Sequence, residues 1–409
     1  MRMKLFCLPL HLAVLVLLAS PALAQDLVVR AGTIHTMAGE PIENGVIVIR
    51  DGKIAAIGAA GEVDEPQGFR VLEAAVVTPG LIDAHGTLGL TGITNQEQDQ
   101  DQLDRSGAVQ PELRAIDAYN PLDKLVPYVR GFGVTTVHTG HAPGALISGQ
   151  TCIVKTRGNT VDEAVVDAET MIAATVGGGG MRQGGSPGTR GKLVSVLRSE
   201  LFKAQEYARK VEAAGDDASK RPARDLKLEA LARVLSKETP LLVTADRAQD
   251  IASTLRVAEE FDIDIVLDSG AEAYLLIDQI KAAGIPVIIH PGMQRTGGEK
   301  ENASFGTAAK LRAAGIPVAM QTSFEGYVPK VRVVLWEAAM AARHGNSFEE
   351  ALAMITRDAA AILGIADRVG TIEAGKDGDL ALFDGDPFEY TTHCVGTVIE
   401  GEVVSDEPH

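Results

Sequence analysis

The stretches KAAGIPVII (residues 281–289) and RAAGIPVAM (residues 312–320) decide the fold, because they repeat one structural unit. Each unit combines the end of a helical pattern, a glycine (Gly284 or Gly315), a proline and a short apolar run. Glycine commonly ends helices because it adopts left-handed backbone angles at low cost. Repeated helix–glycine–proline–strand units favour parallel βα construction, with strands covered on both faces.

Working outward, further apolar runs predict strands that alternate with helical patterns. The predicted strands are GVTTVHTG (133–140), TCIVKTRG (151–158), LLVTAD (241–246) and DIVLDSG (264–270). Both ends of the chain are rich in Val and Ile and carry turn signals such as Asp51-Gly52. The simplest topology is α/β: a (β/α)8 TIM-like barrel over residues 80–367 and a small β-sandwich formed by residues 25–79 and 368–409.

The first 24 residues have the pattern of a secretory signal peptide. Arg2 and Lys4 precede an apolar run, and Ala22-Leu23-Ala24 matches a small-x-small cleavage pattern. The alternative is a retained membrane anchor, although the apolar run is shorter than the ~20 residues that span a bilayer. The sequence therefore predicts export to the periplasm or outside, cleavage near Ala24, and no membrane span in the mature chain.

The composition is that of a globular protein: 409 residues, 45% hydrophobic, with a net charge of −17. Loss of Arg2 and Lys4 with the signal peptide would make the charge −19. Such a chain repels phosphate backbones, which argues against nucleic acid as a partner. The mature chain keeps Cys152 and Cys394, for which no pairing is predicted, and a homo- or hetero-oligomer is left open.

Three segments resemble a known family. VVTPGLIDAHGTLGL (76–90), GVTTVHTG (133–140) and GTIEAGKDGDLALFDGDP (370–387) are similar to the amidohydrolase superfamily, in particular to its exported imidazolonepropionase-related members. The resemblance implies one or two divalent metals, such as zinc, at the carboxyl end of a barrel, where a metal activates water and an aspartate moves its proton. It also implies ligands on the first, fifth, sixth and eighth barrel strands.

Most of the ligand set that the resemblance implies is replaced here. His85 matches the first histidine of an HxH pair, but Thr87 stands in the second position, Thr244 replaces the fifth-strand histidine, and Ser323 replaces the eighth-strand aspartate. Lys155 matches a bridging lysine. Hydroxyls are weaker zinc ligands than imidazole or carboxylate, so the metal site is depleted. Thr87, Thr244 and Lys155 are also candidates for contacts to substrate.

A relocated site is one interpretation of the remaining histidines. The four residues at predicted strand ends are His85, His138, His141 and His290. Loops at that end of a barrel form active sites, so these histidines are candidate metal ligands; the alternative is that each is a hydrogen-bonded structural residue. Glu325 is a weak candidate for the missing catalytic carboxylate, against the alternative of an exposed loop acid.

Two functions follow from these patterns. The first is hydrolysis of carbon–nitrogen bonds, in non-peptide or small-peptide amides, at a non-standard or reduced metal site. The second is a catalytically inactive barrel that binds a small molecule or partners another subunit. The cofactor is accordingly either a divalent metal or none, and the expected partner is an amide-type small molecule.

Overall fold

The computed structural model describes residues 26–409, apart from 95, 291, 294–295 and 325–332. The predicted signal peptide, residues 1–24, lies outside the described residues. Within the described part we find no helix whose length and apolar character would suit a bilayer crossing.

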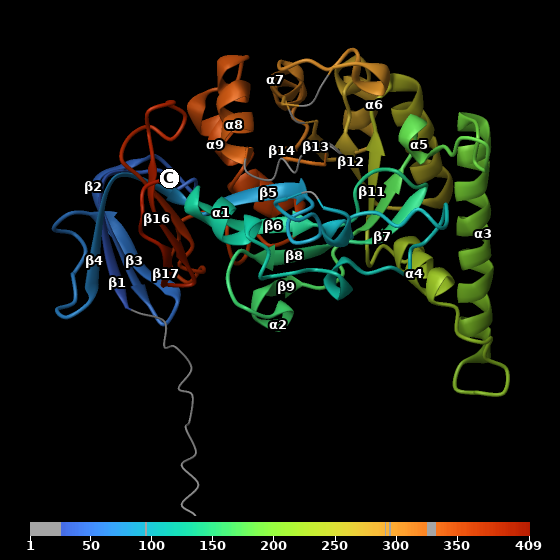
Figure 1. The fold of residues 1–409 in the computed structure, drawn as a ribbon, viewed down its shortest axis with the longest axis horizontal. Coiled ribbons are helices and arrows are strands. Elements are labelled where there is room, and N and C mark those ends of the chain that lie inside the picture. Colours follow the sequence, from blue (N-terminus) through green and yellow to red (C-terminus); the bar gives the residue numbers. More distant parts are fainter. Residues whose placement is uncertain (1–25, 95, 291, 294–295, 325–332) are drawn as a thin grey trace, which may run out of the picture.

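Strands from both ends of the chain form one seven-stranded sheet with the order β17-β16-β15-β4-β1-β2-β3 (Figure 1). The strands are β1 (Leu27–Ile34), β2 (Ile42–Arg50), β3 (Lys53–Ala59), β4 (Arg70–Pro79), β15 (Leu380–Phe383), β16 (Cys394–Ile399) and β17 (Glu402–Ser405). The antiparallel pair of β15 and β4 joins the two termini. Asp51 and Gly52, with φ of 50° and 78°, form the tight turn between β2 and β3 that the sequence predicts.

The remaining strands form two sheets, with the orders β5-β6-β8-β9 and β14-β13-β12-β11-β10-β7. Their bounds are β5 (Leu81–Gly86), β6 (Val134–Thr139), β7 (Ile147–Gln150), β8 (Cys152–Lys155), β9 (Val165–Asp167), β10 (Ile172–Thr175), β11 (Leu241–Ala245), β12 (Ile265–Ser269), β13 (Val287–Ile289) and β14 (Val318–Met320). β5 pairs in parallel with β6, and β10 to β14 pair in parallel.

The expectation of eight parallel strands fails at the third position. β8 is antiparallel to β6, and β7 is antiparallel to β10. The segment between β6 and β7 contains no helix, whereas a parallel return usually needs a helical crossover. Hydrogen bonds therefore join these strands into two sheets rather than one closed ring of parallel strands.

Helices surround the two sheets, and the last of them packs against their shared apolar interior. They are α1 (Leu125–Gly131), α2 (Val161–Ala164), α3 (Arg190–Ala214), α4 (Leu226–Leu235), α5 (Ala248–Phe261), α6 (Ile277–Ala282), α7 (Thr307–Ala313), α8 (Val334–Arg343), α9 (Phe348–Ala353) and α10 (Arg357–Ile362). In Figure 1, α3 stands at the edge farthest from the terminal sheet. The repeated units are α6–β13 and α7–β14, with Gly284 and Gly315 at φ of 67° and 82° just after each helix.

The two sheets share one apolar interior, and the candidate site lies just beyond it toward the carboxyl ends of the strands. Its members include Ile82, Ile153, Leu242, Val266, Ile288 and Ala319, together with Ala359, Ala360 and Leu363 from the region of α10. Side chains two positions apart on a strand point to the same side. Thr244, Asp268 and Gln321, each two residues beyond a member of this cluster, therefore enter the same interior nearer the carboxyl ends of the strands.

Candidate functional site

A buried pair of His85 and Asp268 lies at the carboxyl ends of the parallel strands. His85 Nδ1, on β5, is 3.1 Å from Asp268 Oδ1, on β12, and the two side chains are only 3% and 0% exposed. Thr244 Oγ1 donates to Asp268 Oδ2 at 2.5 Å, and Gln321 Nε2 donates to Asp268 Oδ1 at 2.7 Å. The Asp268 carboxylate is thus surrounded by donors from three other segments of the barrel.

The surroundings of the pair favour the charged form of each group. Burial favours the neutral form of each group, but for both groups the charge of the partner and the hydrogen bond between them outweigh it. The pKa of His85 is therefore raised above its ordinary value, and the pKa of Asp268 is lowered below its own. Opposite charges at this distance in a buried site stabilise each other's charged form.

Three atoms at this level are buried without a hydrogen-bond partner: His85 Nε2, Thr87 Oγ1 and Gln321 Oε1. Buried polar atoms nearly always have partners in folded proteins. A small molecule that enters the carboxyl end of the barrel would supply those partners. Thr87 therefore stays a candidate for a contact to substrate, whereas the Thr244 hydroxyl is already bonded to Asp268.

The seam between β5 and β14 is closed by side-chain and loop contacts. Asp83 accepts hydrogen bonds from the Thr322 backbone N–H, at 3.0 Å, and from the Thr322 hydroxyl. The Ser323 N–H donates to the His85 carbonyl at 2.9 Å. Burial raises the pKa of Asp83 to about 6, against the opposing effect of the Thr322 bonds. These contacts fix the position of His85 relative to the end of β14.

Ser323, in the position where the resemblance implies a catalytic aspartate, is buried and has φ of 53°. A non-glycine residue with positive φ is uncommon and marks a backbone held by its surroundings. The end of β14 therefore has a constrained backbone but no carboxylate at this position. Glu325, the weak candidate for that carboxylate, lies outside the described residues.

The four histidines do not form one metal cluster. The rings of His85 and His138 lie 5.6 Å apart, but His138 Nδ1 donates to the Ala84 carbonyl at 2.7 Å and His138 Nε2 lies 2.6 Å from Thr151 Oγ1. Burial, followed by the charge of His85, lowers the pKa of His138 to about 3. Both nitrogens of this neutral ring are used by the protein, which leaves neither for a metal.

The other two histidines differ from His138. Burial, with a contribution from the charge of His85, lowers the pKa of His141 to about 4, and both of its ring nitrogens are buried without a hydrogen-bond partner. His290 follows β13 and lines a small hollow together with Phe305, Met320 and Glu337. Neither is joined to His85 by a hydrogen bond.

Lys155 lies at the other end of the barrel, which corrects its assignment to the metal or substrate site. Because β8 is antiparallel to β6, Lys155 is level with Thr136 near the start of β6. Its Nζ is 2.8 Å from both Asp377 Oδ2 and Asp379 Oδ2. Lys155 therefore joins the barrel to the terminal sheet instead of facing a ligand.

The comparisons with known proteins agree with this architecture. A model of the Amidohydrolase family matches residues 222–405. A solved amidohydrolase from Thermotoga maritima MSB8 is 28% identical, with a TM-score of 0.88 over 93% of this chain and all of that one. The chain is thus similar to proteins of the amidohydrolase superfamily over most of its length. The same likeness supports a TIM-barrel-type α/β fold.

Two curated members of the superfamily add detail. An imidazolonepropionase from Maricaulis maris is 27% identical over 373 residues, which cover 84% of this chain and 88% of that protein. The amidohydrolase tasK from Hapsidospora irregularis is 23% identical over 90% of this chain, but this chain spans only 40% of the length of tasK.

The described residues at the carboxyl ends of the barrel strands do not fit a divalent metal. Within the described ranges, no three His, Cys, Asp or Glu side chains are placed together to hold an ion. A catalytic zinc site uses three protein ligands and one open position. Here His85 and Asp268 are bonded directly to each other, and the neighbouring positions carry hydroxyls and an amide.

Gln321 and Asp268 are two site residues that the sequence patterns did not single out. Both had a signal. Each is a polar residue two positions beyond an apolar, inward-facing residue (Ala319 or Val266), so strand periodicity alone places it in the interior.

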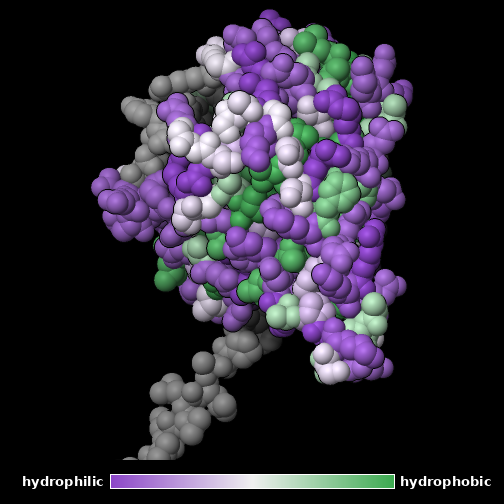
Figure 2. Space-filling view, turned by 90° about the vertical axis from the view of Figure 1, so that its right-hand side faces the viewer, coloured by the Kyte–Doolittle hydropathy of each residue, from purple (hydrophilic) through white to green (hydrophobic). Residues whose placement is uncertain are grey.

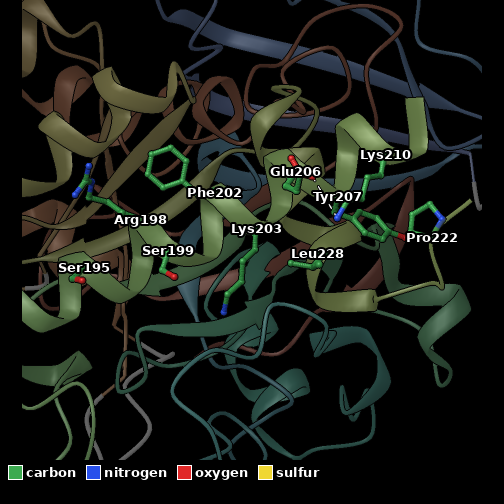
Figure 3. Close-up of a pocket in the computed structure, with 10 residues that line it drawn as sticks. All are labelled: Ser195, Arg198, Ser199, Phe202, Lys203, Glu206, Tyr207, Lys210, Pro222 and Leu228. Atoms are coloured by element: carbon green, nitrogen blue, oxygen red, sulfur yellow. Dashed lines mark ion pairs between the residues drawn. The ribbon is translucent and has the colours of Figure 1, made fainter. Parts of the chain in front are cut away.

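A larger hollow, of about 680 Å³, lies on the outer surface of α3 and is lined by residues including Arg198, Phe202 and Leu228 (Figure 3). It is remote from β5, and its cations are paired: Arg198 with Glu260, Lys203 with Glu200 and Lys210 with Glu206. The face that carries α3 is mostly hydrophilic, with apolar colour in small areas (Figure 2). This surface shows no feature that points to a particular ligand.

Proposed function

We propose that this chain hydrolyses carbon–nitrogen bonds of a small amide-type molecule bound at the carboxyl end of its barrel, with a reduced site centred on His85. One observation carries the proposal: His85 is held through Nδ1 by Asp268, while its Nε2 is buried without a partner. An imidazole fixed in this way can give a proton to, or take one from, a bound molecule. The relatives named amidohydrolase and imidazolonepropionase support hydrolysis as the reaction class.

In this proposal each residue has a limited role. Water adds to the carbonyl carbon of the substrate, the Nε2–H of charged His85 gives its proton to the leaving nitrogen as the C–N bond breaks, and the neutral imidazole then takes up the proton that the added water releases. Asp268 keeps the ring oriented and charged, and Thr87 offers a hydroxyl to the bound molecule. Ser323 cannot replace an aspartate as a base, because a hydroxyl near its ordinary pKa does not accept a proton at neutral pH.

A second candidate function is binding without turnover. It is favoured by the lack of a group that could act as the base, since Ser323 does not accept a proton. The Asp268 carboxylate accepts hydrogen bonds from Thr244, His85 and Gln321, so its oxygens are not poised to activate water. A chain of this kind would bind the amide-type molecule, or support another subunit, through the same surface.

The test is amine release from a panel of cyclic amides, N-acyl amino acids and dipeptides. We expect release by the wild-type chain and its loss in His85→Ala, with His393→Ala as the matched control, since His393 is exposed and lies just before β16. Release that survives His85→Ala would refute the assignment to His85. Calorimetric binding without release would establish the second function instead.

We also propose that the chain is exported and works as a soluble protein, either alone or in a homo- or hetero-oligomer. The support is the N-terminal sequence pattern described above. N-terminal sequencing of protein from the periplasm or medium should find a start just after Ala24, and an intact N-terminus in the membrane fraction would contradict this.

A further inference from the structure

We propose that the His85–Asp268 pair, with Thr244 and Gln321, takes the place of the metal ion, so that this chain holds no divalent ion at the carboxyl end of its barrel. The inference concerns how the site is held together and does not depend on whether the chain hydrolyses a substrate.

The direction of the hydrogen bonds is the first argument. Gln321 Nε2 donates both to the Ile288 carbonyl, at 3.1 Å, and to Asp268. A carbonyl only accepts hydrogen bonds, so the NH₂ group of Gln321 must face this corner, and it carries no acceptor. The Thr244 hydroxyl and the Nδ1–H of His85 also point hydrogen atoms at Asp268. The oxygens of Asp268 are thus already occupied by three donors, and a metal ion bound by this carboxylate would have to displace them.

The supply of ligands is the second argument. His85 and Asp268 are two potential ligands, and a zinc site needs at least three from the protein. His138 uses both ring nitrogens within the protein, and the Asp83 carboxylate is bonded to Thr322. Within the described residues no third carboxylate, imidazole or thiolate completes the set.

The position of the network is the third argument. His85 belongs to the sheet that begins with β5, whereas Thr244, Asp268 and Gln321 belong to, or directly follow, strands of the sheet that ends with β14. The network thus crosses the interior and ties the two sheets together at one end. A metal with ligands from several strands would do the same, so the network removes the structural need for one.

The direct test is the metal content of the full mature chain, purified from cells grown with added Zn, Mn, Fe, Co and Ni. We expect no metal near one ion per chain, and the same melting temperature with and without EDTA. Near-stoichiometric metal that disappears in His85→Ala would overturn the inference, as would a melting temperature that EDTA lowers.

A double-mutant cycle gives a second readout. His85→Gln and Asp268→Asn, alone and combined, report the coupling between the two side chains in urea unfolding. We expect the coupling to be equal with and without EDTA, because no ion mediates it; a coupling that EDTA abolishes would refute the direct pair. If a variant does not fold, the metal content of the wild-type chain still decides. Neither readout uses turnover, so a failed hydrolysis assay leaves both results interpretable.

Discussion

Replacement of Lys155 by methionine tests the structural assignment of this residue to the junction between barrel and terminal sheet. Methionine keeps the length of the side chain and removes its charge. In the wild-type chain, Lys155 Nζ contacts Asp377 and Asp379 at 2.8 Å each and Glu400 at 3.4 Å, and its side chain is 3% exposed. A lysine at a substrate site could be lost with little effect on stability, whereas this one holds buried acids.

The size of the effect depends on which cations remain paired with each acidic side chain once Lys155 is replaced. Asp377 retains Lys53 and Arg368, and Glu400 retains Arg157 and Arg368. Asp379, by contrast, pairs with no other cation in the described part of the chain and keeps only the Glu400 N–H at 2.8 Å. Breaking a buried pair so that one charge is left uncompensated costs about 3–5 kcal/mol. We expect Lys155→Met to lower the free energy of unfolding by that amount at neutral pH.

The effect should depend on pH. Burial already raises the pKa of Asp379, and Lys155 opposes this rise, so loss of Lys155 raises the pKa further. A carboxyl group with a higher pKa in the folded chain binds more protons there than when unfolded, so its presence lowers stability as the pH rises. The deficit of Lys155→Met should therefore be largest at neutral pH and shrink in acid.

Urea unfolding at several pH values measures this, with Lys53→Met as the matched control. Lys53 also pairs with Asp377, but its side chain is 52% exposed, and exposed pairs contribute only about 0–1 kcal/mol. A cost for Lys155→Met no larger than that for Lys53→Met would refute the reasoning. Addition of Asp379→Asn to Lys155→Met should recover much of the loss, since it removes the unpaired charge.

Three further predictions follow from the described contacts. Thr244→Val should lower the free energy of unfolding by about 1.5–3 kcal/mol, because Asp268 loses a hydrogen bond to its charged carboxylate; an unchanged urea midpoint would contradict the network. Gly80→Ala should lower the free energy of unfolding by about 1–3 kcal/mol through overpacking, because the new Cβ would lie 2.3 Å from Thr135 Oγ1. A melting temperature equal to that of the wild-type chain would show that Thr135 moves aside without cost. Burial would raise the pKa of Asp377, but Lys155 above all lowers it to about 2. The ionised Asp377 carboxylate therefore stabilises the folded chain above the unfolded pKa of about 3.9, and this stabilisation is lost as the pH falls toward 2. Asp377→Asn should accordingly flatten the acid limb of the unfolding curve.

Local patterns were sufficient for much of the fold. The repeats around Gly284 and Gly315 predicted the α6–β13 and α7–β14 units. A capping box of Ser347 and Glu350 begins α9, and the apolar segment that follows forms two helices, α9 and α10. Periodicity reports which residues face the core but does not show where a buried helix breaks.

Strand direction was the feature that local patterns could not supply. TCIVKTRG has the composition of a barrel strand, and it forms one, but nothing within it shows that it runs against β6. Direction is set by pairing with distant residues, and it decides which end of the barrel receives Lys155. One reversed strand therefore moved a predicted site residue from the substrate end to the opposite end.

The loss of metal ligands and the gain of the Asp268 network are best understood as one change. Thr87, Thr244 and Ser323, taken singly, are only weaker ligands in the positions where stronger ones are expected. A carboxylate in the same interior would be costly if it stayed unpaired, because a buried charge needs partners. Thr244 and Gln321 provide those partners, and His85 supplies the opposite charge. One of these replacements, Thr244, thus also stabilises Asp268, which is why the metal content, more than any single substitution, separates a damaged site from a rebuilt one.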